Sequence, residues 1–170
     1  TAVVLEDSCK TIPKHKFCFN GLDFIRMGDS VTWANIEVEG ATVKDTVFMD
    51  IAMGEAGNDT VFWPVKIVDF ADGRIYLESD FETFHLLGRV RIESPTYAHS
   101  TTGLRVGSSV ADLKAAYSDL MARPFPEYNV VEIMRDNRTI FHVPLSDYWP
   151  EGVEDYDVQA IPNDVKVSRI

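Results

Sequence analysis

The sequence predicts an α+β protein: an antiparallel sheet with one or two packed helices, built by tandem duplication of a unit of roughly 75–80 residues. A short phrase occurs twice, as Ile25–Val31 and as Leu104–Val110, and both copies share Arg, Gly, Ser and the final Val. Alternating apolar and polar segments follow the first copy, and a helix signal follows the second. We expect a leader at 1–19, a first repeat at 20–95 and a second at 96–170, the repeats either separate or joined in one compact domain. The alternative is that the short identity arose by chance.

The first repeat is expected to consist mainly of strands. Pro64 indicates that its third strand lies at an edge or contains a bulge, because proline cannot donate to the ladder. The Asp72-Gly73 pair is a strong hairpin signal. Residues 32–36 fit either a short helix or a strand. The strands are predicted at 36–39, 43–53, 61–70, 74–78 and 88–93.

The second repeat contains the one convincing helix. Ser109 is placed to cap its N-terminus, and Asp112 completes an approximate capping box. Pro124 is expected to end it. An apolar stripe at helical spacing consists of Val110, Leu113, Tyr117 and Leu120. Strands are predicted to follow at 128–134, 139–143 and 165–167.

The repeated phrase has a structural interpretation. Gly28 and Gly107 are expected to adopt a positive φ or a tight turn. Ser30 and Ser109 are placed to cap the backbone N–H groups that follow, each cap contributing about 1 kcal/mol. The alternative is that the arginines of the two copies bind an anion beside a helix N-terminus.

The composition excludes several functional classes. The chain has 170 residues and a formal net charge of −11, from 27 acidic and 16 basic side chains. Because phosphate backbones are repelled by such a charge, we expect no nucleic-acid partner. No apolar run approaches the roughly 18 residues that a membrane-spanning helix needs. An acidic surface suits a secreted protein or a basic partner; the alternative is that it serves solubility alone.

The two cysteines, Cys9 and Cys18, are predicted to form a disulfide that closes a small loop. Free thiols are one alternative, and a metal site that includes His15 is another, although no fourth ligand lies nearby. A disulfide would place the protein outside the cytoplasm.

The segment Thr102–Leu113 carries a resemblance to known families. A Gly-bounded strand end leads there into a Ser-capped helix with an acid and an aliphatic residue. It is similar to the small outer-membrane lipoproteins of the SmpA/OmlA type and to the tandem-repeat beta-lactamase inhibitor proteins. Arg91–Tyr97 also resembles uncharacterised secreted proteins and lipoproteins of Gram-negative bacteria. The resemblance implies a bacterial envelope compartment (periplasmic, outer-membrane or secreted), with a possible lipid anchor upstream, and a protein partner rather than catalysis.

The sequence lacks the common catalytic and metal-binding motifs. No G-x-S-x-G, H-E-x-x-H, P-loop or dinucleotide fingerprint occurs in the sequence. The acidic segment 147–158 fails the calcium-loop pattern, since Trp149 and Val158 stand where oxygen ligands are needed. An irregular calcium site and a solvated acidic loop remain the alternatives for it. We predict no metal and no cofactor.

Loop aromatics are the best candidates for recognition, because Tyr and Trp are enriched at binding hot spots. The alternative is that they anchor loops to the core. The predicted binding residues are Phe125, Tyr128, Tyr148, Trp149 and Tyr156.

The functional prediction is a non-catalytic, extracytoplasmic protein-binding or envelope-assembly module. The alternative is a hydrolase of envelope glycans or peptides that uses a carboxylate pair roughly 5–10 Å apart. Secretion as an inhibitor of another organism's enzyme would use the same binding chemistry.

Overall fold

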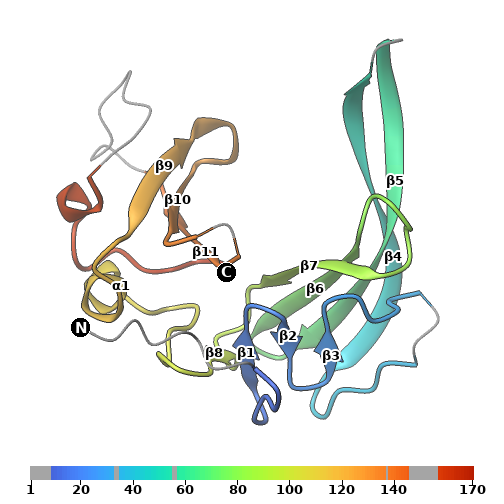
Figure 1. The fold of residues 1–170 in the computed structure, drawn as a ribbon, viewed down its shortest axis with the longest axis horizontal. Helices are drawn as coiled ribbons and strands as arrows, with labels where there is room; N and C mark the ends of the chain where they lie inside the picture. The colour runs from blue at the N-terminus through green and yellow to red at the C-terminus, as the bar shows by residue number, and fades with distance from the viewer. Residues whose placement is uncertain (1–8, 33–34, 55–56, 137, 146–156) are drawn as a thin grey trace. The chain divides into compact units, whose positions relative to one another are not determined.

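The computed structural model describes residues 9–32, 35–54, 57–136, 138–145 and 157–170 (Figure 1). The chain forms two compact units. One is continuous, Asn20–Ser94, and we call it the arm unit. The other joins Thr1–Phe19 to Pro95–Ile170, and we call it the helix unit.

The arm unit is built on a four-stranded antiparallel sheet in the order β4-β5-β6-β7. Phe70 pairs with Gly73 where β5 turns into β6, which confirms the hairpin predicted from Asp72-Gly73. A short antiparallel hairpin, β2 (Gly21–Leu22) and β3 (Ile25–Arg26), precedes the sheet. The sheet strands are β4 (Thr42–Gly54), β5 (Gly57–Phe70), β6 (Gly73–Ser79) and β7 (Leu87–Ile92).

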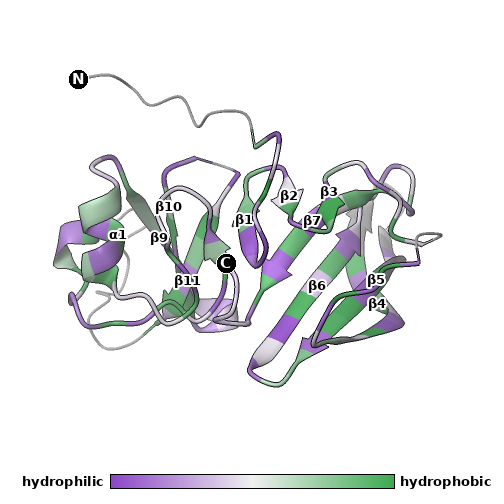
Figure 2. Cartoon of the chain, turned by 90° about the horizontal axis from the view of Figure 1, so that it is seen from below, coloured by the Kyte–Doolittle hydropathy of each residue, from purple (hydrophilic) through white to green (hydrophobic). Residues whose placement is uncertain are grey.

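One face of this sheet contributes to the core of the arm unit. Val68, Ile75 and Ile92 lie opposite one another on β5, β6 and β7, and all three are buried. Leu22 and Val31, from the segment that precedes the sheet, are buried too. Figure 2 shows hydrophobic bands alternating with hydrophilic ones along these strands, as expected for strands with one buried face.

β4 and β5 continue well beyond the other two strands (Figure 1). β6 pairs with β5 only between Val65 and Phe70. β4, in contrast, pairs with β5 along its whole length, up to the Gly54–Gly57 pair. We call the projecting two-stranded part, residues 47–54 and 57–64, the arm.

The helix unit packs one α-helix, α1 (Val110–Ala116), against a three-stranded antiparallel sheet. Leu113 of the helix and Ile133 and Phe141 of the sheet are buried in one hydrophobic cluster. The sheet has the order β11-β10-β9, and β1 pairs with β8 in parallel in a second sheet of order β3-β2-β1-β8. The elements are β1 (Lys16–Cys18), β8 (Ala98–His99), β9 (Met121–Phe125), β10 (Val130–Met134) and β11 (Ile140–Pro144), with the 3-10 turns η1 (Pro126–Tyr128) and η2 (Val158–Ala160).

The predicted α+β class is wrong: the protein is mostly β, with a single α-helix in the described residues. The helix begins where predicted, since Ser109 and Asp112 form a complete capping box. It ends at Ala116, well before Pro124, because Tyr117 is extended and the chain enters β9 at Met121. The predicted apolar stripe therefore reaches beyond the helix itself.

The two copies of the repeated phrase form the same turn. Gly28 and Gly107 both have a positive φ, of 87° and 92°. Asp29 N donates to Arg26 O at 3.0 Å, and Ser108 N donates to Arg105 O at the same distance. In each copy the side chain three residues after the arginine also accepts a hydrogen bond from the arginine backbone N. The distance is 2.8 Å from Arg26 N to Asp29 Oδ2 and 3.0 Å from Arg105 N to Ser108 Oγ.

Each copy also binds a later segment of its own unit in the same way. Gly28 N donates to Leu87 O, and Gly107 N donates to Val167 O. The return bonds run from Leu87 N to Asp29 O and from Val167 N to Ser108 O. The copies differ afterwards: α1 follows the second, whereas the described residues between Ser30 and β4, 31–32 and 35–41, form no helix. The prediction that Ser30 caps the backbone N–H groups that follow it extends to residues 33–34, which lie outside the described residues.

Candidate functional site

The arm presents two different faces. In an antiparallel ribbon, residues directly opposite each other point to the same side. The register pairs Val47 with Pro64, Met49 with Phe62, and Ile51 with Thr60. We call the side made by these six residues the apolar face. It carries no charged side chain.

The apolar face is open to solvent. Val47 is 58% exposed, Met49 63%, Ile51 63% and Phe62 57%. Single exposed hydrophobic residues are ordinary on protein surfaces, but large neighbours on one face are not. These four side chains follow one another along two paired strands, so the exposed apolar surface is continuous.

The opposite side of the arm is anchored to the sheet at its base. Trp63 is buried, and its ring packs edge-on against Phe48 (6.1 Å between centroids) and Phe81 (5.1 Å). Phe48 also contacts Tyr76 of β6, whose ring lies under the Arg91 guanidinium at 5.4 Å. This aromatic cluster covers the base of the arm on its reverse side, the side opposite the apolar face.

The base of the apolar face is marked by an ion pair. Lys66 is buried along its stem, and its Nζ lies 2.5 Å from Oδ1 of Asp45, its partner on β4. Two residues further along β5, on the same side, Val68 belongs to the buried core. The apolar face is therefore on the same side of β5 as the core face, and the apolar alternation continues outward past the point where burial ends.

The local sequence explains why the arm is a long ribbon. Between positions 46 and 51 and again between 60 and 65, almost every residue is β-branched, aromatic or Met, and such residues favour strands. The ribbon closes at the Gly54–Gly57 pair, where Gly57 has a φ of 122°. Only glycine adopts that conformation without strain.

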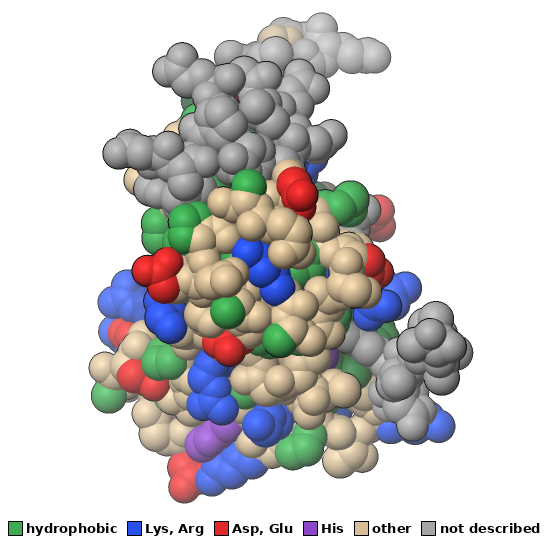
Figure 3. Space-filling view, turned by 90° about the vertical axis from the view of Figure 1, so that its left-hand side faces the viewer, with side chains coloured by type: hydrophobic (Ala, Val, Ile, Leu, Met, Phe, Trp, Pro, Cys, Tyr) green, Lys and Arg blue, Asp and Glu red, His purple; other side chains and the backbone are tan. Residues whose placement is uncertain are grey.

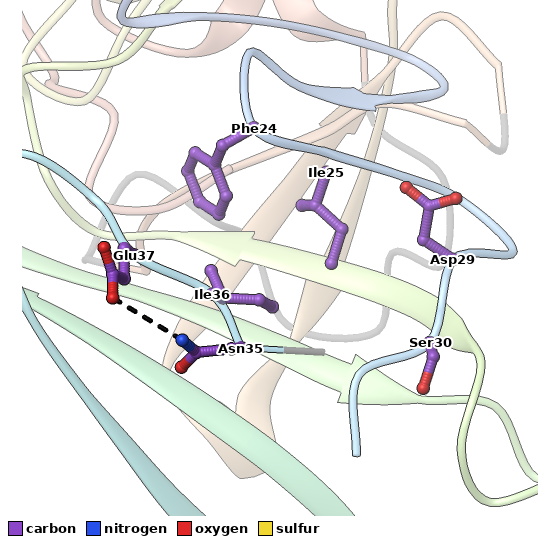
Figure 4. Close-up of a pocket in the computed structure, with 7 residues that line it drawn as sticks. All are labelled: Phe24, Ile25, Asp29, Ser30, Asn35, Ile36 and Glu37. Atoms are coloured by element: carbon purple, nitrogen blue, oxygen red, sulfur yellow. Dashed lines mark hydrogen bonds between the residues drawn. The ribbon is translucent and has the colours of Figure 1, made fainter. Parts of the chain in front are cut away.

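Two hollows lie within the arm unit, and neither has the features of an acid–base site. The first is drawn in Figure 4, where Asp29 and Glu37 stand at opposite ends with Phe24, Ile25 and Ile36 between them. Asp29 accepts a hydrogen bond from Arg26 N, and Glu37 from the Asn35 side chain. Each of these carboxylates is thus held by its own local contacts.

The second hollow contains Glu78 and Asp80. Glu78 is buried and pairs with Arg91 at 2.6 Å and with Arg89 at 3.7 Å. Asp80 accepts from the hydroxyl and the backbone N of Thr83, and these bonds hold the pKa of Asp80 below its usual 3.8. A carboxylate with a lowered pKa is a poor general acid, so Asp80 serves the structure of the turn, and Glu78 is held in its ion pairs with the two arginines.

Two of the five predicted binding residues are brought together. Phe125 ends β9 half-buried, and Tyr128 ends η1 and is 69% exposed; their ring centroids are 6.3 Å apart. The Arg123 guanidinium lies 5.2 Å from the Phe125 ring. Tyr148, Trp149 and Tyr156 lie outside the described residues.

Cys9 and Cys18 form a disulfide, so the free-thiol and metal alternatives do not apply to them. Most of the acidic segment 147–158 lies outside the described residues, although Asp157 caps η2 by accepting from Gln159 N. Among the side chains that the structure describes, no group of three or more His, Cys, Asp and Glu is placed to hold a metal ion.

On the face shown in Figure 3, Lys and Arg side chains alternate with acidic and hydrophobic ones. Within the described residues, no helix is long and apolar enough to cross a membrane.

Comparison of the chain with protein-family models, with curated proteins and with solved structures finds no match in any of the three.

The apolar face was missed by reasoning from sequence, although its signal is present. Val47, Met49 and Ile51 alternate with the residues between them, which predicts a half-buried strand. Alternation alone does not reveal that the apolar side of a strand stays uncovered. The length of the strand was the available clue, because 13 residues exceed the span of the shorter neighbours in the sheet.

Proposed function

We propose that this chain is a non-catalytic assembly module that docks onto another protein chain through the apolar face of its arm. The observation that carries the proposal is the continuous exposure of Val47, Met49, Ile51 and Phe62. Together they offer on the order of 400 Å² of apolar surface, within the range of the largest patch on an ordinary monomer, which is often functional.

The arm is suited to docking because its shape is fixed before binding. The aromatic cluster at Trp63 and the continuous β4–β5 ladder hold the ribbon in place. A preorganised surface loses less conformational entropy when it binds, so more of the contact energy appears as affinity. The hydrolase alternative has no such support, since the carboxylates in the two hollows are held in structural bonds.

We also propose that the protein works outside the cytoplasm, in the cell envelope or as a secreted protein. The Cys9–Cys18 disulfide supports this compartment, because disulfides persist mainly in oxidising surroundings. The resemblance of Thr102–Leu113 to envelope lipoproteins points to the same compartment.

The test of the docking function is affinity capture from an envelope extract of the source cells with the immobilised protein. The variant Met49→Lys/Phe62→Lys places charges on the apolar face. The control Asp50→Lys/Asp59→Lys introduces the same side chain on the same two strands, at positions that face the other side of the arm. We expect a protein retained by the wild type and the control and lost by the apolar-face variant.

A fourth bait, Phe125→Ala/Tyr128→Ala, tests the loop aromatics of the helix unit. Loss of capture by this variant alone would transfer binding to that surface and contradict docking through the arm. Equal capture by all four baits would also contradict it.

A further inference from the structure

We infer that the chain docked onto the apolar face is a second copy of this protein, so that two arms pack face to face in a symmetric dimer. The inference rests on the proposed docking function and names its partner. It follows from the charge, shape and area of the apolar face.

The charge distribution favours self-association at this one place. Two copies with a net charge of −11 each repel at most approaches. The apolar face carries no charge, and the acids of the arm, Asp50 and Asp59, lie on its reverse side by register. Face-to-face packing leaves those two acids in solvent on the two outer sides, and Asp45, at the base of the apolar face, is already paired with Lys66.

The chemistry of the face also selects its partner. A basic partner would be drawn to carboxylates, yet the exposed side chains here are Val47, Met49, Ile51 and Phe62. Their complement is a flat, uncharged apolar surface. A two-fold axis presents the same patch on both subunits, so a neutral, apolar patch is complementary to itself.

The shape suits this packing, because ribbons pack face to face about 10 Å apart with side chains interdigitating. The Met49–Phe62 pair lies between the Val47–Pro64 and Ile51–Thr60 pairs, at the middle of the strip. A two-fold axis near that pair brings the largest side chains of both copies together.

The area predicts a reversible dimer. The four exposed side chains of both copies supply roughly 800 Å² in total, and Pro64, Thr60 and the flanking backbone add to this, against about 1,200–2,000 Å² for stable interfaces. An interface of this size belongs with the weak and transient ones below that range, so we expect a dissociation constant of about micromolar or weaker.

The test is sedimentation equilibrium over roughly 5–200 μM protein, at about 50 mM and 500 mM NaCl. We expect wild-type dimers whose dissociation constant falls as salt rises, because screening weakens the repulsion between two acidic chains while apolar contact persists. Met49→Lys and Phe62→Lys should each raise the constant at least about tenfold. Asp50→Lys and Asp59→Lys should leave it unchanged or lower it.

A second measurement needs no substitution. In methyl-labelled wild-type protein, the NMR signal of the Met49 methyl should shift with protein concentration. Met121, in the helix unit, is an internal control because it is similarly exposed, at 58%. Its signal should stay in place.

Three outcomes overturn the second-copy inference: a wild-type monomer throughout this range, equal weakening by the Lys variants of both sides, or a Met49 signal independent of concentration. If the wild type is monomeric but captures another protein through the arm, the docking function stands and only the second copy is excluded. If neither dimer nor arm-dependent capture is found, both fail.

Discussion

Single residues decide whether the repeated phrase leads into a helix. Both copies form the same turn, with Gly28 and Gly107 at positive φ. In the second copy, Asp112 N donates to Ser109 Oγ at 3.1 Å, and the Asp112 carboxylate accepts from Ser109 N at 2.7 Å. At the position equivalent to Asp112 the first copy has Trp33, which cannot accept the return bond. The capping box is therefore possible only in the second copy, and there the helix forms.

Replacing Ser109 by Ala should lower the free energy of unfolding by roughly 0.5–2 kcal/mol through loss of this cap. Ser109→Asn is the control, since Asn caps about as well as Ser and should stay close to the wild type. Urea denaturation followed by circular dichroism gives both values. An unchanged midpoint for the alanine variant would mean that the cap contributes nothing to stability.

Three aspartates should make the fold sensitive to acid. The pKa values of Asp69, Asp80 and Asp112 are all below the ordinary 3.8, through hydrogen bonds from Arg74, Thr83 and Ser109 respectively. A lowered folded-state pKa means that the unfolded chain binds protons first as the pH falls. The stabilisation is therefore complete above the unfolded-state value and is lost progressively below it.

The measurement is the urea midpoint at several pH values between 7 and about 2.5. We expect a plateau above pH 5 and a decline below about 4. Asp112→Asn should show a shallower decline than the wild type, because one of the three groups no longer titrates. A midpoint that rises as the pH falls below 4 would contradict the sign of all three shifts.

At the scale of the element, two neighbouring residues of β5 contribute differently to the stability of the arm. Trp63 is buried in the aromatic cluster at the base, whereas Phe62 points the other way and is exposed. Trp63→Ala should lower the free energy of unfolding by about 3–5 kcal/mol, as for other large aromatic residues in a core. Phe62→Ala should change it by less than about 1 kcal/mol, because little burial is lost. Thermal unfolding of the two variants compares them directly, and equal losses would mean that Phe62 is covered in the folded chain.

The elements also show how far the sequence predicts this structure. Local signals worked where bonding is local: the capping box at Ser109 and the hairpin at Asp72-Gly73 are both present. The predicted length of the helix was wrong. The apolar stripe continues through Tyr117 into residues that pack on the same hydrophobic cluster but are not helical. Helical spacing and packing on a common core therefore gave the same pattern here.

At the scale of the whole molecule, the predicted class failed because the α-helix found in the described residues, α1, is short, whereas most of the other elements are strands. The duplicated phrase indicated two similar halves, but what the structure repeats is the turn and its docking onto Leu87 and Val167. The exposure of the apolar face could not be predicted from the sequence, for a different reason. Which side of a strand is covered depends on where the neighbouring strands end, and that is set by the tertiary fold.

The division into two units predicts where the disulfide acts. Cys9 and Cys18 both belong to the helix unit, and a loop with a sequence separation of 9 constrains the unfolded chain by about 2.5–3 kcal/mol. Reduction should therefore speed amide hydrogen exchange mainly in β1 and β8, the parallel pair that Cys18 adjoins. The ladder of β4 to β7 lies wholly in the arm unit and should keep its protection. Exchange measured with and without reductant makes the comparison, and Cys9→Ser/Cys18→Ser should reproduce the reduced pattern. Equal acceleration in both units would mean that they unfold as one cooperative body, and the arm would then be stabilised indirectly by the disulfide.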